Sequence, residues 1–231
     1  MVDASIIVPT YNEKNNLPEL AQRIFSAVKK SGLSVELIVV DDNSPDGTGN
    51  VAEGLKSDYN VKVIHRTGKL GLASAVIEGF AIASSDILGV IDADLSHPPE
   101  IVPELIKPIK DGTAEVVVGS RYVAGGGMDK WPLLRRITSK GAVLLALPLT
   151  SVKDCVSGLF FLKKSVINGV ELNAKGYKIG LEVLVKGNYK RVVEVPYVFM
   201  NRKIGKSKLS KSEFTNYLIN LKNLYAYKFF R

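Results

Sequence analysis

The chain has 231 residues, of which 46% are hydrophobic, and a formal net charge of +8 at pH 7. This length suits one large domain, or one domain with an appendage. The single cysteine, Cys155, excludes a disulfide framework and favours a reducing compartment. The two histidines belong to no zinc-binding motif. No stretch approaches the roughly 20 apolar residues of a membrane span, and the chain leads directly into a strand, so we expect no signal peptide.

The positive charge is concentrated at the C-terminal end of the chain. Residues 201–231 contain eight basic residues and one acidic residue, a net charge of +7, which leaves only +1 for residues 1–200. A basic face across the whole domain, of the kind that binds nucleic acid, is therefore not expected. We predict no nucleic-acid partner.

Strand-like and helix-like patterns alternate along the first 120 residues. Short apolar and β-branched runs predict strands at residues 4–9, 35–40, 61–65, 87–91 and 116–119. Between them, apolar residues at helical spacing predict helices at residues 16–30, 48–56 and 71–84. This rhythm is typical of parallel strands joined by right-handed helical crossovers. We therefore predict an α/β fold with a mostly parallel central sheet flanked by helices.

The rhythm changes after residue 120. Residues 131–147 mix basic and apolar residues at helical spacing, and a late strand is predicted at residues 192–199. Because Pro196 cannot donate a backbone hydrogen bond, we expect that strand at an edge of the sheet, or starting late.

The last residues carry a separate pattern. Apolar and aromatic side chains recur every three or four residues between Phe214 and Tyr225, accompanied by Lys222 and Lys228. This pattern predicts an amphipathic helix at a membrane interface, with cations that meet anionic headgroups. A C-terminal helix packed on its own domain is the alternative.

The most informative feature is a pair of carboxylates after the buried strand at residues 87–91. Asp92 and Asp94 lie at its carboxyl end, where open α/β sheets bind ligands. Two like charges on the same side of an extended segment repel each other, so the pair suggests a divalent cation between them. Oxygen ligands favour Mg²⁺ or Mn²⁺, which keep coordination positions for substrate phosphates. The pair predicts a nucleoside diphosphate substrate; a structural turn and helix cap is the plainer alternative.

Two other strand ends also carry polar residues. Residues 11–13 follow the first strand, and Asp41 and Asp42 end the second. In a parallel sheet these segments lie along one edge, where carboxylates accept from ribose hydroxyls or a base N–H. Neither GxGxxG after the first strand nor GxxxxGK[ST] occurs, so we do not expect a glycine-rich loop to hold the nucleotide.

Taken together, several motifs resemble the family-2 glycosyltransferases with the GT-A fold. The generic part of the resemblance lies at residues 6–13 and 39–46. Motifs closer to the branch that uses polyprenyl phosphates lie at residues 92–100, 119–122, 131–136, 139–142, 194–196 and 205–209. The resemblance implies a GT-A catalytic domain at residues 1–212, followed by the amphipathic interfacial or juxtamembrane helix at residues 213–231.

The resemblance also implies a role for each matching position. Donor-binding positions are Pro9, Tyr11, Glu13, Asp41, Asp42, Ala93, Arg202 and Lys208, the last two on a loop that closes over substrates in the family. Metal-binding positions are Asp92, Asp94 and Ser96; Ser96 stands where archaeal members have a longer Gln, so a water is expected to intervene. Acceptor-phosphate positions are Arg121, Arg135 and Ser139. The implied catalytic residues are Asp92, Asp94 and Arg121.

The reaction implied is transfer of mannose from GDP-mannose to dolichyl or another polyprenyl phosphate, with inversion and with Mg²⁺ or Mn²⁺ as cofactor. A phosphate monoester is already ionised near neutral pH, so it needs cations that position it rather than a general base. Arg121 and Arg135 can bind its oxygens in bidentate fashion. The implied partners are a nucleotide-sugar donor, the lipid phosphate and a membrane surface. We expect a peripheral protein on the cytoplasmic face of a membrane, or a soluble part of a longer membrane protein.

Two other functions fit the same residues. A UDP-sugar such as UDP-glucose could be the donor, because the region around Asp41 does not distinguish guanine from uracil. A non-catalytic basic module that binds membranes or nucleic acid through its tail is the second alternative. The clustered strand-end carboxylates and the nearly neutral residues 1–200 argue against that module.

Overall fold

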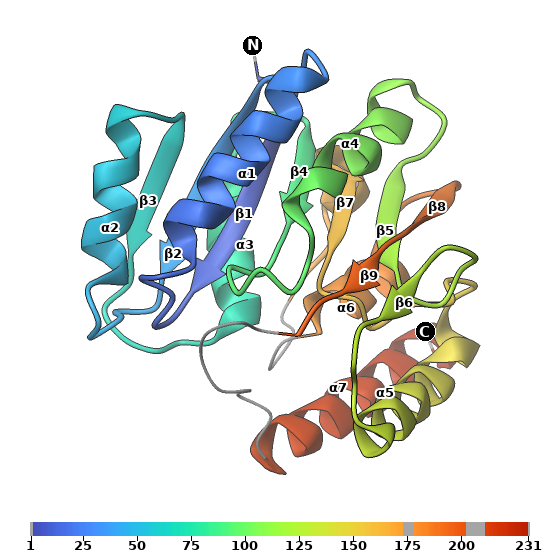
Figure 1. Ribbon diagram of the computed structural model, residues 1–231. Helices are drawn as coiled ribbons and strands as arrows, with labels where there is room; N and C mark the ends of the chain where they lie inside the picture. The colour runs from blue at the N-terminus through green and yellow to red at the C-terminus, as the bar shows by residue number, and fades with distance from the viewer. Residues whose placement is uncertain (1, 173–177, 202–210, 231) are drawn as a thin grey trace.

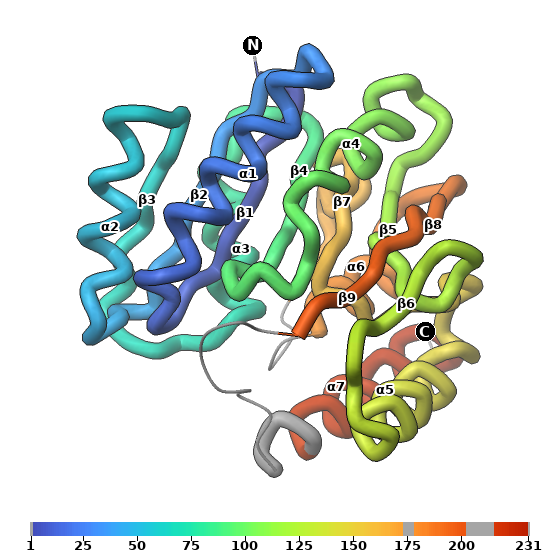
Figure 2. The backbone as a smooth tube through the Cα atoms, viewed as in Figure 1, coloured from blue at the N-terminus to red at the C-terminus, as the bar shows by residue number. Residues whose placement is uncertain are grey.

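The computed structural model of the chain describes residues 2–172, 178–201 and 211–230. Its centre is a seven-stranded sheet in the order β3-β2-β1-β4-β7-β5-β8 (Figures 1 and 2). The strands of this sheet are β1 Ala4–Thr10, β2 Val35–Asp41, β3 Val61–His65, β4 Ile87–Val90, β5 Val116–Ser120, β7 Phe160–Lys163 and β8 Val192–Pro196. A second, two-stranded sheet pairs β6 Gly127–Met128 with β9 Val198–Phe199.

The mostly parallel sheet predicted from the strand rhythm is confirmed. The five early strands all form, and their pairings with one another are parallel. The late strand lies at the sheet edge as Pro196 suggests, but it divides at Tyr197 into β8 and β9. The antiparallel strand β7, between β4 and β5, was not predicted. It is only four residues long, and its partner residues on β4 and β5 lie at least 42 positions earlier in the chain.

Helices cover both faces of the sheet (Figure 1). The α-helices are α1 Leu17–Lys30, α2 Thr48–Gly54, α3 Leu72–Ile82, α4 Val102–Lys110, α5 Leu133–Ala146, α6 Ile179–Lys186 and α7 Lys211–Phe229. Helices α1, α2 and α4 pack on one face, and α3, α5, α6 and α7 contribute to the core on the other. Strand alternation divides the two cores: Ile6 faces the first and Ile7 the second.

Helix α1 shows how local sequence builds this arrangement. Its buried side chains recur every three or four residues, from Leu17 to Val28, and form one apolar stripe toward the sheet. Pro18 occupies the first turn, where its missing N–H has no intrahelical partner to lose. The chain leaves the helix through Gly32 at φ +67°, a left-handed conformation that glycine adopts without strain.

The C-terminal helix α7 packs onto its own domain. Tyr217, Leu221 and Leu224, three of the apolar residues expected at a membrane interface, are buried in the second core instead. The Tyr217 hydroxyl donates to the Ala142 carbonyl on α5 at 2.6 Å, so α5 and α7 lie side by side below the sheet (Figure 1). No helix in the described part of the chain is long and apolar enough to cross a membrane. The division of the chain at residue 212 remains a prediction.

A buried carboxylate ties the amino ends of three strands together, and its replacement should weaken the fold. Glu36, whose side chain is 2% exposed, accepts from Ser5, from the backbone and hydroxyl of Ser84, and from Lys62. Burial alone would raise its pKa, but the hydrogen bonds from Ser5 and Ser84 outweigh it and lower the pKa to about 2. Because Glu36→Gln removes the charge that these donors stabilise, we expect it to lower the free energy of unfolding at pH 7 by about 2 kcal/mol.

The effect of Glu36 should depend on pH with a definite sign. Its folded-state pKa lies below the ordinary value of 4.5, so its contribution is present above pH 4.5 and is lost as pH falls toward 2. Urea unfolding of Glu36→Gln and the unsubstituted protein should therefore differ strongly at pH 7 and weakly near pH 2. An equal difference at both pH values would contradict this account.

Candidate active site

The predicted strand-end residues meet at one edge of the sheet. Strands β2, β1 and β4 are neighbours, and Thr10 at the end of β1 pairs with Asp41 at the end of β2. The backbone N–H of Ile91 donates to the Ile7 carbonyl at 3.2 Å, which carries the segment with Asp92 to the same edge. The structure thus brings together three of the predicted groups of residues.

Asp41 and Asp42 are held by the protein's own donors. Asp41 accepts from the Thr10 hydroxyl at 3.1 Å and from the Ser44 backbone at 3.0 Å. Asp42 accepts from the Gly71 backbone at 2.8 Å and forms a buried ion pair with Arg66. The two carboxylates, predicted as donor contacts, therefore also fix the loops that follow β2 and β3.

Three further predicted donor-binding positions lie at the end of β1 or just after it. Pro9 and Tyr11 are half-buried, and the Lys69 ammonium lies 4.2 Å from the centre of the Tyr11 ring. The Glu13 carboxylate is buried and accepts from the Asn16 side chain at 2.8 Å. Arg202 and Lys208 lie outside the described residues.

A tight turn presents the carboxylates that follow β4. Asp94 is 3% exposed and accepts from the Ser96 backbone at 2.9 Å, while the side chain of Asp92 is 31% exposed. Leu95, directly after Asp94, has φ +60°, a strained conformation for a bulky residue of the kind that clusters at functional sites. Ala93 is buried beneath the turn. The Ser96 hydroxyl is fully buried and has no hydrogen-bond partner among the described residues.

A buried histidine stands behind this turn. The Nδ1 atom of His97 lies 3.8 Å from a carboxylate oxygen of Asp92, and its ring meets the edges of Tyr197 and Phe199. Burial, together with the positive charge of Arg121, lowers the pKa of His97 to about 4. The imidazole is therefore neutral near pH 7.

The acceptor-phosphate positions gather around one tryptophan. The guanidinium carbon of Arg135 lies 3.9 Å from the Trp131 ring centre, and that of Arg121 lies 5.6 Å away. The Ser139 hydroxyl is 3.0 Å from the Tyr122 hydroxyl, and the Arg121 guanidinium also lies over the Tyr122 ring. The structure thus brings Arg121, Arg135 and Ser139 into one cluster.

Asp154, which sequence reasoning missed, orients Arg121. Its fully buried carboxylate accepts from the Arg121 backbone at 2.9 Å, from Nε at 2.8 Å and from Nη2 at 2.7 Å. Burial opposes the charge on Arg121, but the hydrogen bonds to Asp154 outweigh it and raise the pKa of the guanidinium. An aspartate within the apolar stretch 152–162 is the signal that could have indicated it.

Lys178, at the start of α6, is a second residue that sequence reasoning missed. Its ammonium donates to the Val156 carbonyl at 2.7 Å. Burial and the nearby charge of Arg121 lower its pKa to about 8, against the opposing effect of Asp154 and Asp92. Lys178 therefore adds a cation between the carboxylate turn and the arginine cluster, and no local pattern in the sequence identifies it.

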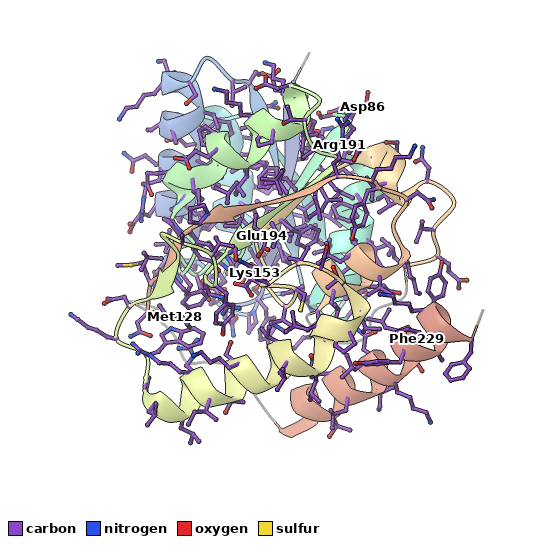
Figure 3. All side chains as sticks on the ribbon, turned by 90° about the vertical axis from the view of Figure 1, so that its right-hand side faces the viewer. Asp86, Met128, Lys153, Arg191, Glu194 and Phe229 are labelled. Atoms are coloured by element: carbon purple, nitrogen blue, oxygen red, sulfur yellow. The ribbon has the colours of Figure 1, made fainter. Side chains whose placement is uncertain are left out.

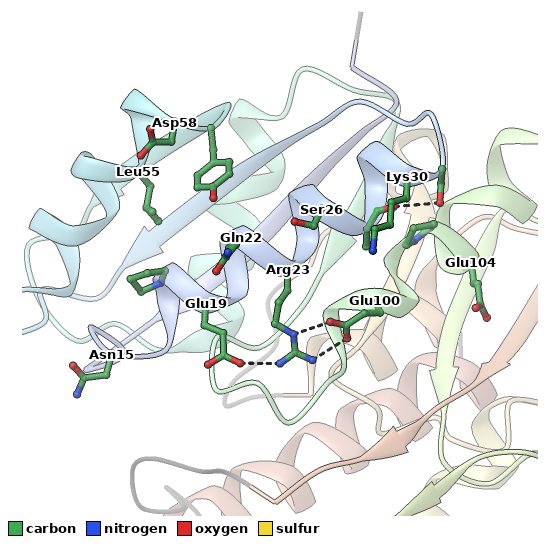
Figure 4. Close-up of a pocket in the computed structure, with 15 residues that line it drawn as sticks. Asn15, Glu19, Gln22, Arg23, Ser26, Lys30, Leu55, Asp58, Glu100 and Glu104 are labelled. Carbon is green, nitrogen blue, oxygen red and sulfur yellow. Dashed lines mark hydrogen bonds and ion pairs between the residues drawn. The ribbon is translucent and has the colours of Figure 1, made fainter.

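A separate groove runs along the outer side of α1 (Figure 4). Arg23 crosses it and pairs with Glu19 and Glu100. None of the predicted site residues lines this groove. The predicted site residues that the structure describes lie elsewhere, and the strand-end cluster is the candidate site.

The fold and the strand-end site define a class of protein. A solved structure of mannosyltransferase PcManGT from Pyrobaculum calidifontis, in complex with GDP-Man and Mn²⁺, superposes with a TM-score of 0.64 at 18% identity. The match covers 97% of this chain and 63% of that one. At this identity the likeness establishes the fold alone, which is that of the GT-A glycosyltransferases.

Comparison of sequences gives the family. The profile of Glycosyl transferase family 2 matches residues 5–170, and this chain belongs to that family. The dolichol-phosphate mannosyltransferase of Pyrococcus furiosus is 51% identical over 224 residues, 95% of this chain. The protein of the same name from Saccharomyces cerevisiae is 42% identical over 239 residues, 99% of this chain. The chain spans 63% of the length of the Pyrococcus relative and 89% of the yeast one.

Proposed function

We propose that this chain transfers mannose from GDP-mannose to dolichyl phosphate, or a related polyprenyl phosphate, with inversion at the anomeric carbon. The observation that carries the proposal is the position of Arg121 and Arg135. Both guanidinium groups lie against the Trp131 ring, next to the strand-end turn that bears Asp92 and Asp94. The names of the two relatives, dolichol-phosphate mannosyltransferase, support mannose as the transferred sugar and dolichyl phosphate as the acceptor.

The donor side of the site suits a divalent cation. Asp92, Asp94 and Ser96 offer two carboxylates and a buried hydroxyl that lacks a hydrogen-bond partner within the described ranges, an all-oxygen set suited to Mg²⁺ or Mn²⁺. When bound, such a cation would neutralise negative charge on the departing nucleoside diphosphate. The mannosyltransferase from Pyrobaculum calidifontis, which shares the fold, was solved with Mn²⁺.

The acceptor side needs positioning rather than proton removal. A phosphate monoester is already an anionic nucleophile near neutral pH. Asp154 engages Nε and Nη2 of Arg121, and no described residue accepts from Nη1, so that side of the guanidinium is available for a phosphate oxygen. Attack by that oxygen on the anomeric carbon, opposite the departing diphosphate, inverts the configuration from α to β.

The lipid part of the acceptor requires a membrane surface, and α5 carries an exposed apolar side suited to it. Leu133 is 73% exposed, Leu134 75% and Leu144 68%. Such large apolar side chains in water indicate an interaction surface, and Arg136 and Lys140 on the same helix are exposed cations that suit anionic headgroups. We propose that the protein acts at the cytoplasmic face of a membrane, with α5 and the exposed side of α7 against the lipid.

Charging this surface should weaken membrane binding. Leu134→Glu is expected to lower the fraction of protein that sediments with anionic vesicles about tenfold. The substitution replaces an apolar side chain that would contact lipid with a carboxylate that the anionic headgroups repel. Ile82→Glu is the matched control, since Ile82 is 42% exposed but lies at the end of α3. Equal sedimentation of the two variants would contradict the assignment of α5.

The donor can be tested by binding alone. Calorimetric titration should show GDP-mannose binding at least about tenfold more tightly than UDP-glucose, with binding weakened when Mn²⁺ or Mg²⁺ is chelated. Tighter binding of UDP-glucose would keep the reaction class and change the donor. Failure of a folded protein to bind either nucleotide sugar would contradict the proposed function and favour a membrane-binding module.

A further inference from the structure

The carboxylate of Glu194, on the edge strand β8, accepts two backbone hydrogen bonds from the loop that carries Asp154. Glu194 accepts from the backbone N–H of Lys153 at 2.9 Å through Oε2, and from that of Asp154 at 3.0 Å through Oε1 (Figure 3). Each carboxylate oxygen therefore binds one of two consecutive amides. This two-point contact fixes the direction of the backbone at Asp154 as well as its position.

The loop needs such a contact because it lacks the regular pairing of a strand or helix. It links the 3-10 helix η3 Leu147–Leu149 to β7, and Asp154 lies in its middle with a fully buried side chain. Without Glu194, the amides of Lys153 and Asp154 would lose their acceptors. A shift of the Asp154 backbone would carry its carboxylate away from Arg121.

Glu194 and Arg121, which both hydrogen-bond to Asp154, lie on or directly after two strands that pair with each other, β8 and β5. In the parallel register of β5 and β8, Val118 pairs with Glu194 and Ser120 with Pro196, and Arg121 follows directly after β5. Asp154 is thus held between Glu194 from one strand and Arg121 from its neighbour. Its carboxylate meets Arg121 at three donors: the backbone N–H, Nε and Nη2. The plane of the guanidinium is therefore set by a carboxylate whose own backbone is set by Glu194.

We propose that Glu194 is a positioning residue for acceptor phosphate: it holds Asp154, which holds the Arg121 guanidinium in the orientation that binds the phosphate. The inference rests on the proposed function, because it assigns Glu194 to the acceptor side of that site. It leads to a specific expectation, since the described part of the donor side is built on β1, β2 and β4, and strands β7 and β5 separate these from β8. Loss of Glu194 should weaken acceptor binding and spare donor binding.

The chain contains a matched control for a purely structural role. Glu115, just before β5, also accepts from two consecutive amides, of Lys190 at 3.3 Å and Arg191 at 2.6 Å. These lie just before β8, so Glu115 caps the opposite end of the same strand pair, away from Arg121. Glu115→Gln makes the same chemical change in the same sheet without reaching the site.

The experiment compares Glu194→Gln, Glu194→Ala and Glu115→Gln with the unsubstituted protein, by calorimetric binding of a short-chain prenyl phosphate and, separately, of GDP-mannose with Mn²⁺. Gln keeps one acceptor oxygen and turns a donor toward the second amide. We expect the Kd for prenyl phosphate to rise about tenfold in Glu194→Gln and further in Glu194→Ala. The Kd for GDP-mannose should stay unchanged in both variants, and Glu115→Gln should leave both constants unchanged.

The outcomes separate this inference from the proposed function. If the unsubstituted protein fails to bind prenyl phosphate, the proposed acceptor is wrong and the inference falls with it. If that protein binds prenyl phosphate but Glu194→Gln binds it equally well, the inference alone is wrong. A parallel loss of both ligands, with a thermal midpoint lowered as in Glu115→Gln, would show that Glu194 only stabilises the fold and would also overturn the inference.

Discussion

Replacement of Asp94 by Asn should lower kcat for mannosyl transfer about 10³-fold. Asn retains a carbonyl oxygen that can accept from the Ser96 backbone, so the turn after β4 is expected to persist. What the substitution removes is the negative charge, which the proposed role of the turn requires for holding a divalent cation. The loss should therefore be chemical rather than structural.

Two measurements distinguish these causes. Mn²⁺ binding, followed by the paramagnetic resonance signal of the free ion, should weaken strongly in Asp94→Asn, while the thermal midpoint changes little. Asp111→Asn, at an exposed position after α4, is the control and should bind Mn²⁺ as the unsubstituted protein does. Normal Mn²⁺ binding by Asp94→Asn would remove Asp94 from the proposed metal site.

The second large effect is expected from Arg121→Lys. Lysine keeps the charge, but its single ammonium cannot engage both oxygens of Asp154 and also present a planar edge to a phosphate. We expect kcat/KM for dolichyl phosphate to fall about 10²- to 10³-fold. The KM for GDP-mannose should change little, because the donor side lies on other strands.

Arg191→Lys is the matched control for this substitution. Arg191 also forms a pair with a carboxylate, Glu115, at the opposite end of the β5–β8 strand pair, but its side chain is 57% exposed. Exposed pairs of this kind contribute about 1 kcal/mol or less. Steady-state kinetics of the two variants should differ by at least about tenfold in kcat/KM; equal values would show that Arg121 is not an acceptor contact.

Much of the fold could be predicted because it follows from local patterns. The buried runs of β1, β2 and β5 are continuous and β-branched, and the apolar stripe of α1 has a clear helical period. Strand β7 could not be found in this way, since its place in the sheet depends on distant partners rather than on its four residues. The same reason left two alternatives open for α7, because its period predicts an apolar side but not whether that side meets a membrane or the domain itself.

The same distinction, between local pattern and tertiary packing, separates the site residues that could be predicted from those that could not. Asp92 and Asp94 stand at the end of a recognisable strand, so topology alone predicts their position. Asp154 and Lys178 enter the cluster through a loop and a helix start whose positions are set by tertiary packing. Arg66 is a further residue of this kind, because its buried ion pair with Asp42 depends on the tertiary fold, while the donor-binding role of Asp42 stays a prediction.

The most direct test is transfer of radiolabelled mannose from GDP-mannose to dolichyl phosphate in vesicles, with Mn²⁺, with Mg²⁺ and with a chelator, beside parallel reactions with UDP-glucose and UDP-N-acetylglucosamine. We predict a β-linked mannosyl lipid that forms from GDP-mannose only and requires the divalent cation. Product from a UDP-sugar alone would contradict the donor. Absence of product from all three donors, with a folded protein bound to the vesicles, would contradict the central claim.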